Sequence, residues 1–210
     1  MFPKFLQLTV VLPLLAMGGA AMALEEPDYE LLFETGEIEF RRYEPYLVAE
    51  VSVSGKSADN QAFRILAGYI FGNNDSDVKM QMTAPVESRD NVSGASTYQD
   101  YAFVMEKAYS LDSLPVPNDE RIRLREKSER IVAVRRFSGR WSEKNINKHE
   151  QRLLDDLQTL GVEIAGPPEL ARYNSPFAPW FLRRNEIIVP VDQAGLNKAV
   201  DIAAGAPARL

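Results

Sequence analysis

The chain has 210 residues, of which 45 % are hydrophobic and 26 % charged, and this globular composition excludes an intrinsically disordered protein. It contains no cysteine, which excludes a disulfide framework, a thiolate metal site and a cysteine nucleophile. From Leu24 onward, 23 basic residues (24 less Lys4) face 30 acidic ones; the net charge is therefore −7, which disfavours nucleic-acid binding.

Residues 1–23 are predicted to be a secretory signal peptide rather than part of the fold. Lys4 supplies the positive end, residues 5–16 are almost wholly apolar, and Ala21-Met22-Ala23 offers a cleavage site after Ala23. The alternative is an uncleaved membrane anchor, because the apolar stretch approaches the length that spans a bilayer. Pro13 within the stretch argues against an anchor, so we expect a periplasmic or secreted protein.

Four strands and one helix are predicted in the first half of the remaining chain. The strands fall at residues 38–43, 47–53, 80–86 and 101–105. In the second of them, Ala49, Val51 and Val53 alternate with polar residues, which is the period of a half-buried strand. Ser57 is expected to begin the helix and Gly72 to end it. One apolar stripe runs along this helix: Phe63, Leu66, Ala67 and Ile70.

The second half repeats this order of elements. Strands are predicted at residues 121–125, 131–137, 170–173 and 185–191. Ser142 is expected to cap a long helix that ends at Gly161. An aromatic, proline-rich loop precedes the last strand. Residues 194–210, rich in alanine and glycine, are predicted to be a flexible tail, with a helix for a binding partner as the weakly indicated alternative.

The two halves also match in the residues that separate their strands from their helices. Val53-Ser54-Gly55 and Phe137-Ser138-Gly139 each precede a helix and lie 84 residues apart, as do residues 101–105 and 185–189. Residues 82–85 are also aligned with 173–176, although these lie 91 residues apart (173 − 82). A duplicated unit is the simplest interpretation. It predicts one α+β domain over residues 24–193, a distorted antiparallel β-barrel or curved sheet with two helices and a ligand cleft between sheet and helices.

Several segments, in their order along the chain, resemble the SOUL/heme-binding protein family. The resemblance covers residues 27–191 and rests on residues 39–45, 49–51, 63–74, 79–86, 115–117, 134–139 and 183–186. The most specific of these is Lys79-Met80-Gln81-Met82-Thr83-Ala84-Pro85-Val86. The resemblance implies a barrel made of a repeated half, which binds heme or another porphyrin in a shallow apolar cleft without an obligatory ligand residue.

A tetrapyrrole site needs an apolar floor and cations for the propionates. The predicted floor is the helix stripe of Phe63, Leu66, Ala67 and Ile70, and the predicted second wall is the loop with Phe177, Trp180 and Phe181. The predicted propionate partners are Arg64, Arg183 and Arg184. Core packing of the stripe, and solvated arginines or an internal pair with Glu186, are the alternatives.

An axial iron ligand is only weakly indicated. His149, the one histidine, lies at the flank of the second helix's apolar face, where a boundary role is the default. Other candidates are Met80, Met82, Met105, Tyr69 and Tyr173. We therefore expect loose heme binding without an axial bond, and no metal site.

Catalytic motifs are missing. Gly55-Lys56-Ser57 lies between a strand and a helix, but a P-loop needs glycine where Glu50 stands. No G-x-S-x-G elbow is present, and His149 has no second histidine to complete a zinc helix. We therefore expect a non-enzymatic binder of heme or another tetrapyrrole. The alternatives are a carrier or sensor of other flat amphipathic molecules and an interaction protein of the envelope.

Overall fold

The computed structural model describes residues 24–55, 57–93 and 96–205, so the predicted signal peptide lies outside the described residues. Within these residues nine strands and three α-helices form an α+β fold, as predicted. The strands are β1 Tyr29–Thr35, β2 Ile38–Tyr43, β3 Tyr46–Val53, β4 Val86–Ser93, β5 Ser96–Val104, β6 Arg123–Lys127, β7 Arg130–Phe137, β8 Glu169–Arg172 and β9 Asn185–Val191. The helices are α1 Ala58–Ile70, α2 Glu143–Thr159 and α3 Gln193–Ala203, with a short 3₁₀ helix, η1, at Trp180–Leu182. None of these helices is both long and apolar enough for a membrane crossing.

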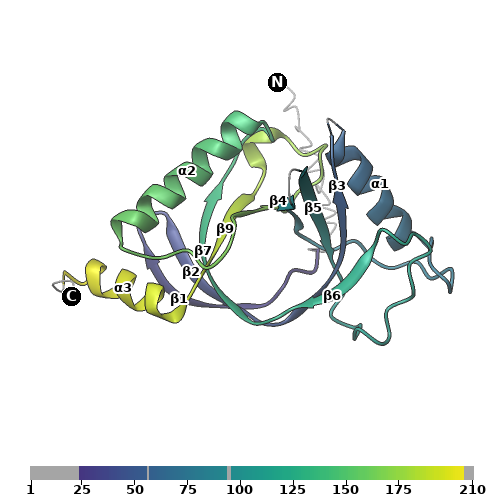
Figure 1. Cartoon of the computed structure of the whole chain (residues 1–210), viewed down its shortest axis with the longest axis horizontal. Helices are drawn as coiled ribbons and strands as arrows, with labels where there is room; N and C mark the ends of the chain where they lie inside the picture. The colour runs from purple at the N-terminus through teal and green to yellow at the C-terminus, as the bar shows by residue number, and fades with distance from the viewer. Residues whose placement is uncertain (1–23, 56, 94–95, 206–210) are drawn as a thin grey trace, which may run out of the picture.

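The strands form one antiparallel sheet in the order β1-β2-β7-β9-β8-β4-β5-β3-β6. Figure 1 shows the sheet curled into part of a barrel, with α1 and α2 outside the curl, close to each other at the top of the view and diverging below. Helix α1 packs on β3 and β5, and α2 packs on β7 and β9. The sheet therefore has an outer face that carries the helices and an inner, concave face.

The predicted duplication is visible in the strand order. Strands β2 to β5 come from the first half of the chain and β6 to β9 from the second. If each strand is renamed as its counterpart in the other half (β2 as β6, β3 as β7, and so on), the order of these eight strands reads the same from the opposite end of the sheet. Strands β3 and β7 are offset by the 84 residues found in the sequence. The centre of this pseudo-twofold symmetry lies where Glu87 of β4 pairs with Ala171 of β8. The alignment of residues 82–85 with 173–176 is wrong, because 82–85 lead into β4 whereas 173–176 follow β8.

Three elements differ from the predictions. Residues 80–85 form no strand, and the third strand of the first half is instead β4, whose sequence is polar. Across β4 and β5, Arg89 and Asn91 both donate hydrogen bonds to Asp100, so charge pairing takes the place of apolar packing. Strand β1 extends the sheet beyond β2 and was not predicted.

The tail prediction is wrong for its first part. Helix α3 occupies Gln193–Ala203, and Asp192 caps it by accepting a hydrogen bond from the backbone N–H of Gly195 at 2.7 Å. Leu196 and Ala199 are buried in the core of the second half, which also contains residues of α2 and β9. The helix forms because these two side chains lie on one face and find an apolar partner surface.

Candidate functional site

The apolar stripe of α1 belongs to the protein core. Leu66, Ala67 and Ile70 are 0 %, 8 % and 1 % exposed and pack against β3 and β5. They leave no surface for a ligand, so the expectation that they form the floor of an open cleft is wrong. The alternative, that the stripe packs in the protein core, is correct. The reason is that α1 lies directly on the sheet, and its apolar face is used up there.

The other two candidates on α1 point outward. Phe63 is 46 % exposed, and its ring meets that of Phe103 edge to face at 5.6 Å between centroids. Arg64 is exposed, and its Nε donates to the backbone oxygen of Asn60 at 3.3 Å. Phe63 is therefore the one residue of the predicted stripe whose ring is open to a ligand.

The aromatic loop between β8 and β9 holds its apolar side chains in solvent. Phe177 is 95 % exposed, Trp180 49 %, Phe181 58 % and Leu182 67 %. The rings of Trp180 and Phe181 meet at 86° with centroids 5.6 Å apart. Four large apolar side chains exposed on one short loop form the kind of patch that marks an interaction site.

Arg183 stabilises this loop by hydrogen bonds to its backbone. Its Nε donates to the Ala178 oxygen at 3.0 Å and its Nη2 to the Pro176 oxygen at 2.7 Å. Its guanidinium stacks 4.3 Å from the ring centre of Trp141, next to the start of α2. Arg183 is thus committed to loop structure, and the exposed cation beside the loop is Arg140, 5.8 Å from the ring centre of Trp180.

Arg184 forms an internal ion pair with Glu186, which was the alternative to binding a propionate. Its Nε pairs with Glu186 at 2.9 Å and its Nη1 with Glu26 at 2.9 Å. The guanidinium also lies 3.6 Å from the ring centre of Tyr173. Its carboxylate partners are therefore within the chain.

Sequence reasoning missed a polar group beneath the aromatic loop. Arg172 of β8 and Asn185 of β9 are register partners on the outer face of the sheet, between the starts of α1 and α2. Arg172 pairs with Asp59 at 3.3 Å, and Asn185 accepts the indole hydrogen bond of Trp141 at 2.6 Å. Among the described residues, Arg172 Nε and Asn185 Nδ2 are buried donors without a partner. Buried donors of this kind require an acceptor, which a bound water or a ligand supplies.

The concave face carries a second group that the sequence did not reveal, a buried ionic network. Lys127 Nζ contacts Glu87 at 2.7 Å and Glu169 at 3.0 Å, and the three residues are at most 7 % exposed. Arg130 adds a two-pronged pair with Glu169, and the Tyr46 hydroxyl donates to Glu87 at 2.7 Å. Burial would raise the pKa of Glu169, but the charge of Lys127 and the hydrogen bond from Arg130 outweigh it and lower the pKa from 4.5 to about 2.

A related cluster lies nearer β2. Arg41 pairs with the fully buried Glu186 at 2.9 Å, and the Tyr173 hydroxyl donates to the same carboxylate at 2.9 Å. Burial opposes ionisation of Glu186, but Arg41 outweighs it and holds the pKa of Glu186 below its usual value. Both clusters pair their charged groups within the chain, and an apolar cluster that includes Val48, Val132 and Ile188 lies on the same face.

The candidates for an axial iron ligand are engaged inside the protein. His149 stacks on Phe137 with ring centres 4.4 Å apart, and burial lowers its pKa. Met80 and Met105 are core residues, and Met82 is half-buried against the same core. The Tyr69 hydroxyl donates to the Pro115 oxygen. Over the described part of the chain no group of three metal-ligating side chains occurs. Among the described residues, these candidates for an axial ligand are therefore engaged in contacts within the protein.

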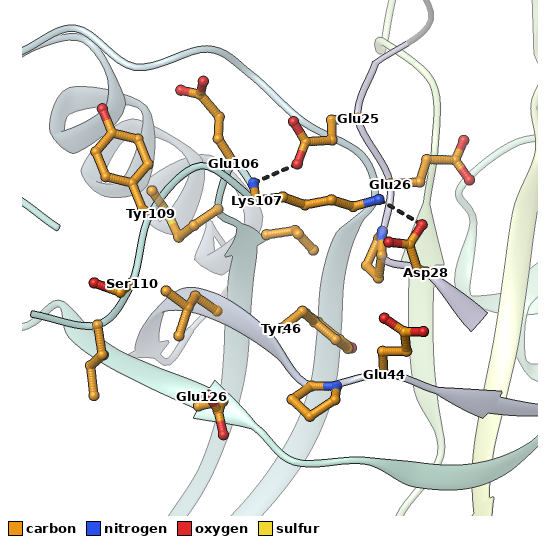
Figure 2. A pocket seen from close by; sticks show the side chains of 16 residues that line it. Glu25, Glu26, Asp28, Glu44, Tyr46, Glu106, Lys107, Tyr109, Ser110 and Glu126 are labelled. Atoms are coloured by element: carbon orange, nitrogen blue, oxygen red, sulfur yellow. Dashed lines mark hydrogen bonds and ion pairs between the residues drawn. The ribbon is translucent and has the colours of Figure 1, made fainter. Parts of the chain in front are cut away.

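A cleft of about 430 Å³ lies elsewhere, where the segment before β1 crosses the turn between β2 and β3 (Figure 2). Its lining includes six carboxylates against one lysine, Lys107. Such a charge repels the propionates of a tetrapyrrole.

A curled antiparallel sheet made of two equivalent halves, each with one helix on the outer face, defines a class of duplicated α+β proteins. Within that class the chain belongs to the SOUL heme-binding protein family, whose match covers residues 24–190. It is also 27 % identical over 192 residues to heme-binding protein 2 of Mus musculus, covering 81 % of this chain and 92 % of that protein. The resemblance seen in the sequence is therefore confirmed.

Solved structures share the fold at much lower identity. The C-terminal domain of EcmrR matches with a TM-score of 0.58 and 10 % identity, over 78 % of this chain and 98 % of that domain. A hydrolase from Listeria innocua matches with a TM-score of 0.52 and 11 % identity, over 74 % of this chain and 92 % of the other. At such identities these likenesses establish the fold alone.

Proposed function

We propose that this protein is an exported, non-catalytic binder of heme or another tetrapyrrole, and that the ligand contacts the aromatic loop between β8 and β9. The observation that carries the proposal is the exposure of Phe177, Trp180, Phe181 and Leu182 on one braced loop of a family member. Export is supported by the apolar N-terminal segment and the small residues before Leu24.

In the proposed complex, the flat ring packs against Trp180 and Phe181, because aromatic faces give large apolar contact at low conformational cost. Arg140 lies beside Trp180 and offers a guanidinium to a carboxylate of the ligand. The unpaired donors of Arg172 and Asn185 lie under the same loop and favour an acceptor there. The proposed mode of binding does not depend on an axial ligand, because the candidates for one among the described residues have partners within the protein.

Titration with hemin, protoporphyrin IX and an unrelated amphipathic dye tests this function. The full chain is expressed with its N-terminal segment, and the periplasmic protein is expected to begin at Leu24. We expect both porphyrins to quench tryptophan fluorescence and the hemin Soret band to be the same in His149→Ala, because His149 is stacked on Phe137. Uptake of the dye alone would favour the general carrier, and uptake of neither would favour the envelope interaction protein.

Trp180→Ala is expected to weaken porphyrin binding by on the order of 1–3 kcal/mol, the scale of one lost aromatic contact. Phe71→Ala is the matched control, because Phe71 is similarly exposed but lies at the far end of α1. Fluorescence titration of both variants measures the effect. Equal affinity of Trp180→Ala and the unaltered protein would remove the loop from the site.

A further inference from the structure

The acidic cleft is a cavity with an apolar floor. Tyr46 and Leu47 of β3, Val104 of β5 and the adjacent Met105 line it from below, and Tyr109 closes one side. Its volume of about 430 Å³ falls within the range of small-molecule sites, roughly 300–1,000 Å³. The cleft thus has the size and the partly apolar lining that an organic ligand needs.

The rim of the cleft is anionic. Among the described residues that line it, six carboxylates and one ammonium give a formal charge of −5, that is 1 − 6. The carboxylates are Glu25, Glu26, Asp28, Glu44, Glu106 and Glu126. Arg184 from outside the cleft pairs with Glu26. Among the described residues, no hydrogen-bond or ion-pair partner is found for the carboxylates of Glu44 and Glu126, which are exposed. Uncompensated charges around a hollow raise the local concentration of cations.

The one cation of the lining shows what the cleft accommodates. Figure 2 shows the side chain of Lys107 lying across the cleft toward Asp28, whose carboxylate it meets at 2.6 Å. The backbone N–H of Lys107 also donates to Glu25. An alkyl chain that ends in an ammonium is therefore already bound here as part of the protein, and it is 48 % exposed.

We propose that this cleft binds an organic polycation of the polyamine class, a methylene chain with two or more protonated amines. Methylene groups match the floor of Tyr46, Leu47 and Met105, and the ammonium groups match the rim carboxylates. A bare metal ion does not fit, since the described residues bring no three metal-ligating side chains together. The inference is independent of tetrapyrrole binding, which uses a different surface and the opposite charge.

Calorimetric titration of the mature protein (residues 24–210) with spermidine at low salt tests the proposal. We expect saturable binding that weakens about tenfold in Glu44→Gln/Glu126→Gln, because two carboxylates that pair with the ammonium groups of spermidine are lost. The control Glu34→Gln/Glu163→Gln removes the same charge from exposed positions outside the cleft and is expected to change the affinity less than about twofold.

A variant that binds spermidine more tightly cannot owe its changed affinity to misfolding, so it complements the two glutamine variants. Lys107→Met removes the competing ammonium and frees Asp28, so spermidine is expected to bind this variant several-fold more tightly. Butylamine carries one charge and is expected to bind the unaltered protein at least about tenfold more weakly than spermidine. Equal weakening in both glutamine pairs, unchanged affinity in Lys107→Met, or absence of heat with spermidine would overturn the proposal. Hemin affinity measured in parallel reports on the aromatic loop separately.

Discussion

Replacing Lys127 with methionine is expected to lower the free energy of unfolding by about 3–5 kcal/mol, the cost of breaking a buried ion pair from one side. The ammonium lies 2.7 Å from Glu87 and 3.0 Å from Glu169, and both carboxylates are at most 4 % exposed. Methionine fills a similar volume, so the loss reports charge rather than a cavity. Urea unfolding at pH 7 measures it.

Two further variants identify the cause of that loss. Lys198→Met removes an exposed lysine that lies 3.7 Å from Glu163 and is expected to change stability by less than about 0.5 kcal/mol. In Lys127→Met/Glu87→Gln one uncompensated charge is neutralised, so at least about 1 kcal/mol of the lost stability should return. A loss below about 1 kcal/mol in Lys127→Met would contradict the view that this network is dry and tightly paired.

The fold could be predicted largely from local signals. The two outer helices follow from apolar stripes and from the serine–glycine breaks before them, and β2 and β9 have the predicted bounds. The 84-residue offset predicted the duplication that the strand order shows. Strand β4 escaped prediction because its alternation is one of charge, with Glu87 and Arg89 facing partners that come from other strands.

The candidate site was harder to predict, for a physical reason. An amphipathic helix shows which of its faces is apolar, but not whether the sheet or a ligand covers that face, and in α1 the sheet covers Leu66 and Ile70. The exposed aromatic loop was predictable, because three aromatic residues in five positions of a short loop leave little room for burial. The unpaired donors of Arg172 and Asn185 depend on the register of β8 against β9, which no local pattern gives.

The buried network needed contacts between distant parts of the chain. Lys127 reaches Glu87 across 40 residues, and Arg41 reaches Glu186 across 145. One sequence signal could have pointed to it: Arg123, Arg125 and Lys127 alternate along β6, which places three cations on one face of a strand. A charged row on the inner face of a curled sheet requires acidic partners on the neighbouring strands.

The same network predicts loss of stability in acid. Glu169 has its pKa lowered from 4.5 to about 2, and Arg41 and its neighbours lower the pKa of Glu186 against the effect of burial. A carboxyl group whose pKa is depressed in the folded state contributes stability that is fully present above the unfolded value and is lost as the pH falls. The window therefore runs from about pH 4.5 down to about pH 2.

Glu169 alone is expected to account for on the order of 3 kcal/mol over that window, because each pH unit between the two pKa values is worth about 1.4 kcal/mol. Urea unfolding at intervals from pH 7 to pH 2 measures the slope. Glu169→Gln is less stable at pH 7, because Lys127 and Arg130 lose a partner, but its stability should fall less steeply below pH 4.5. Parallel curves for the two proteins would mean that Glu169 is not held ionised by its neighbours, and the paired-charge account of the concave face would fail with it.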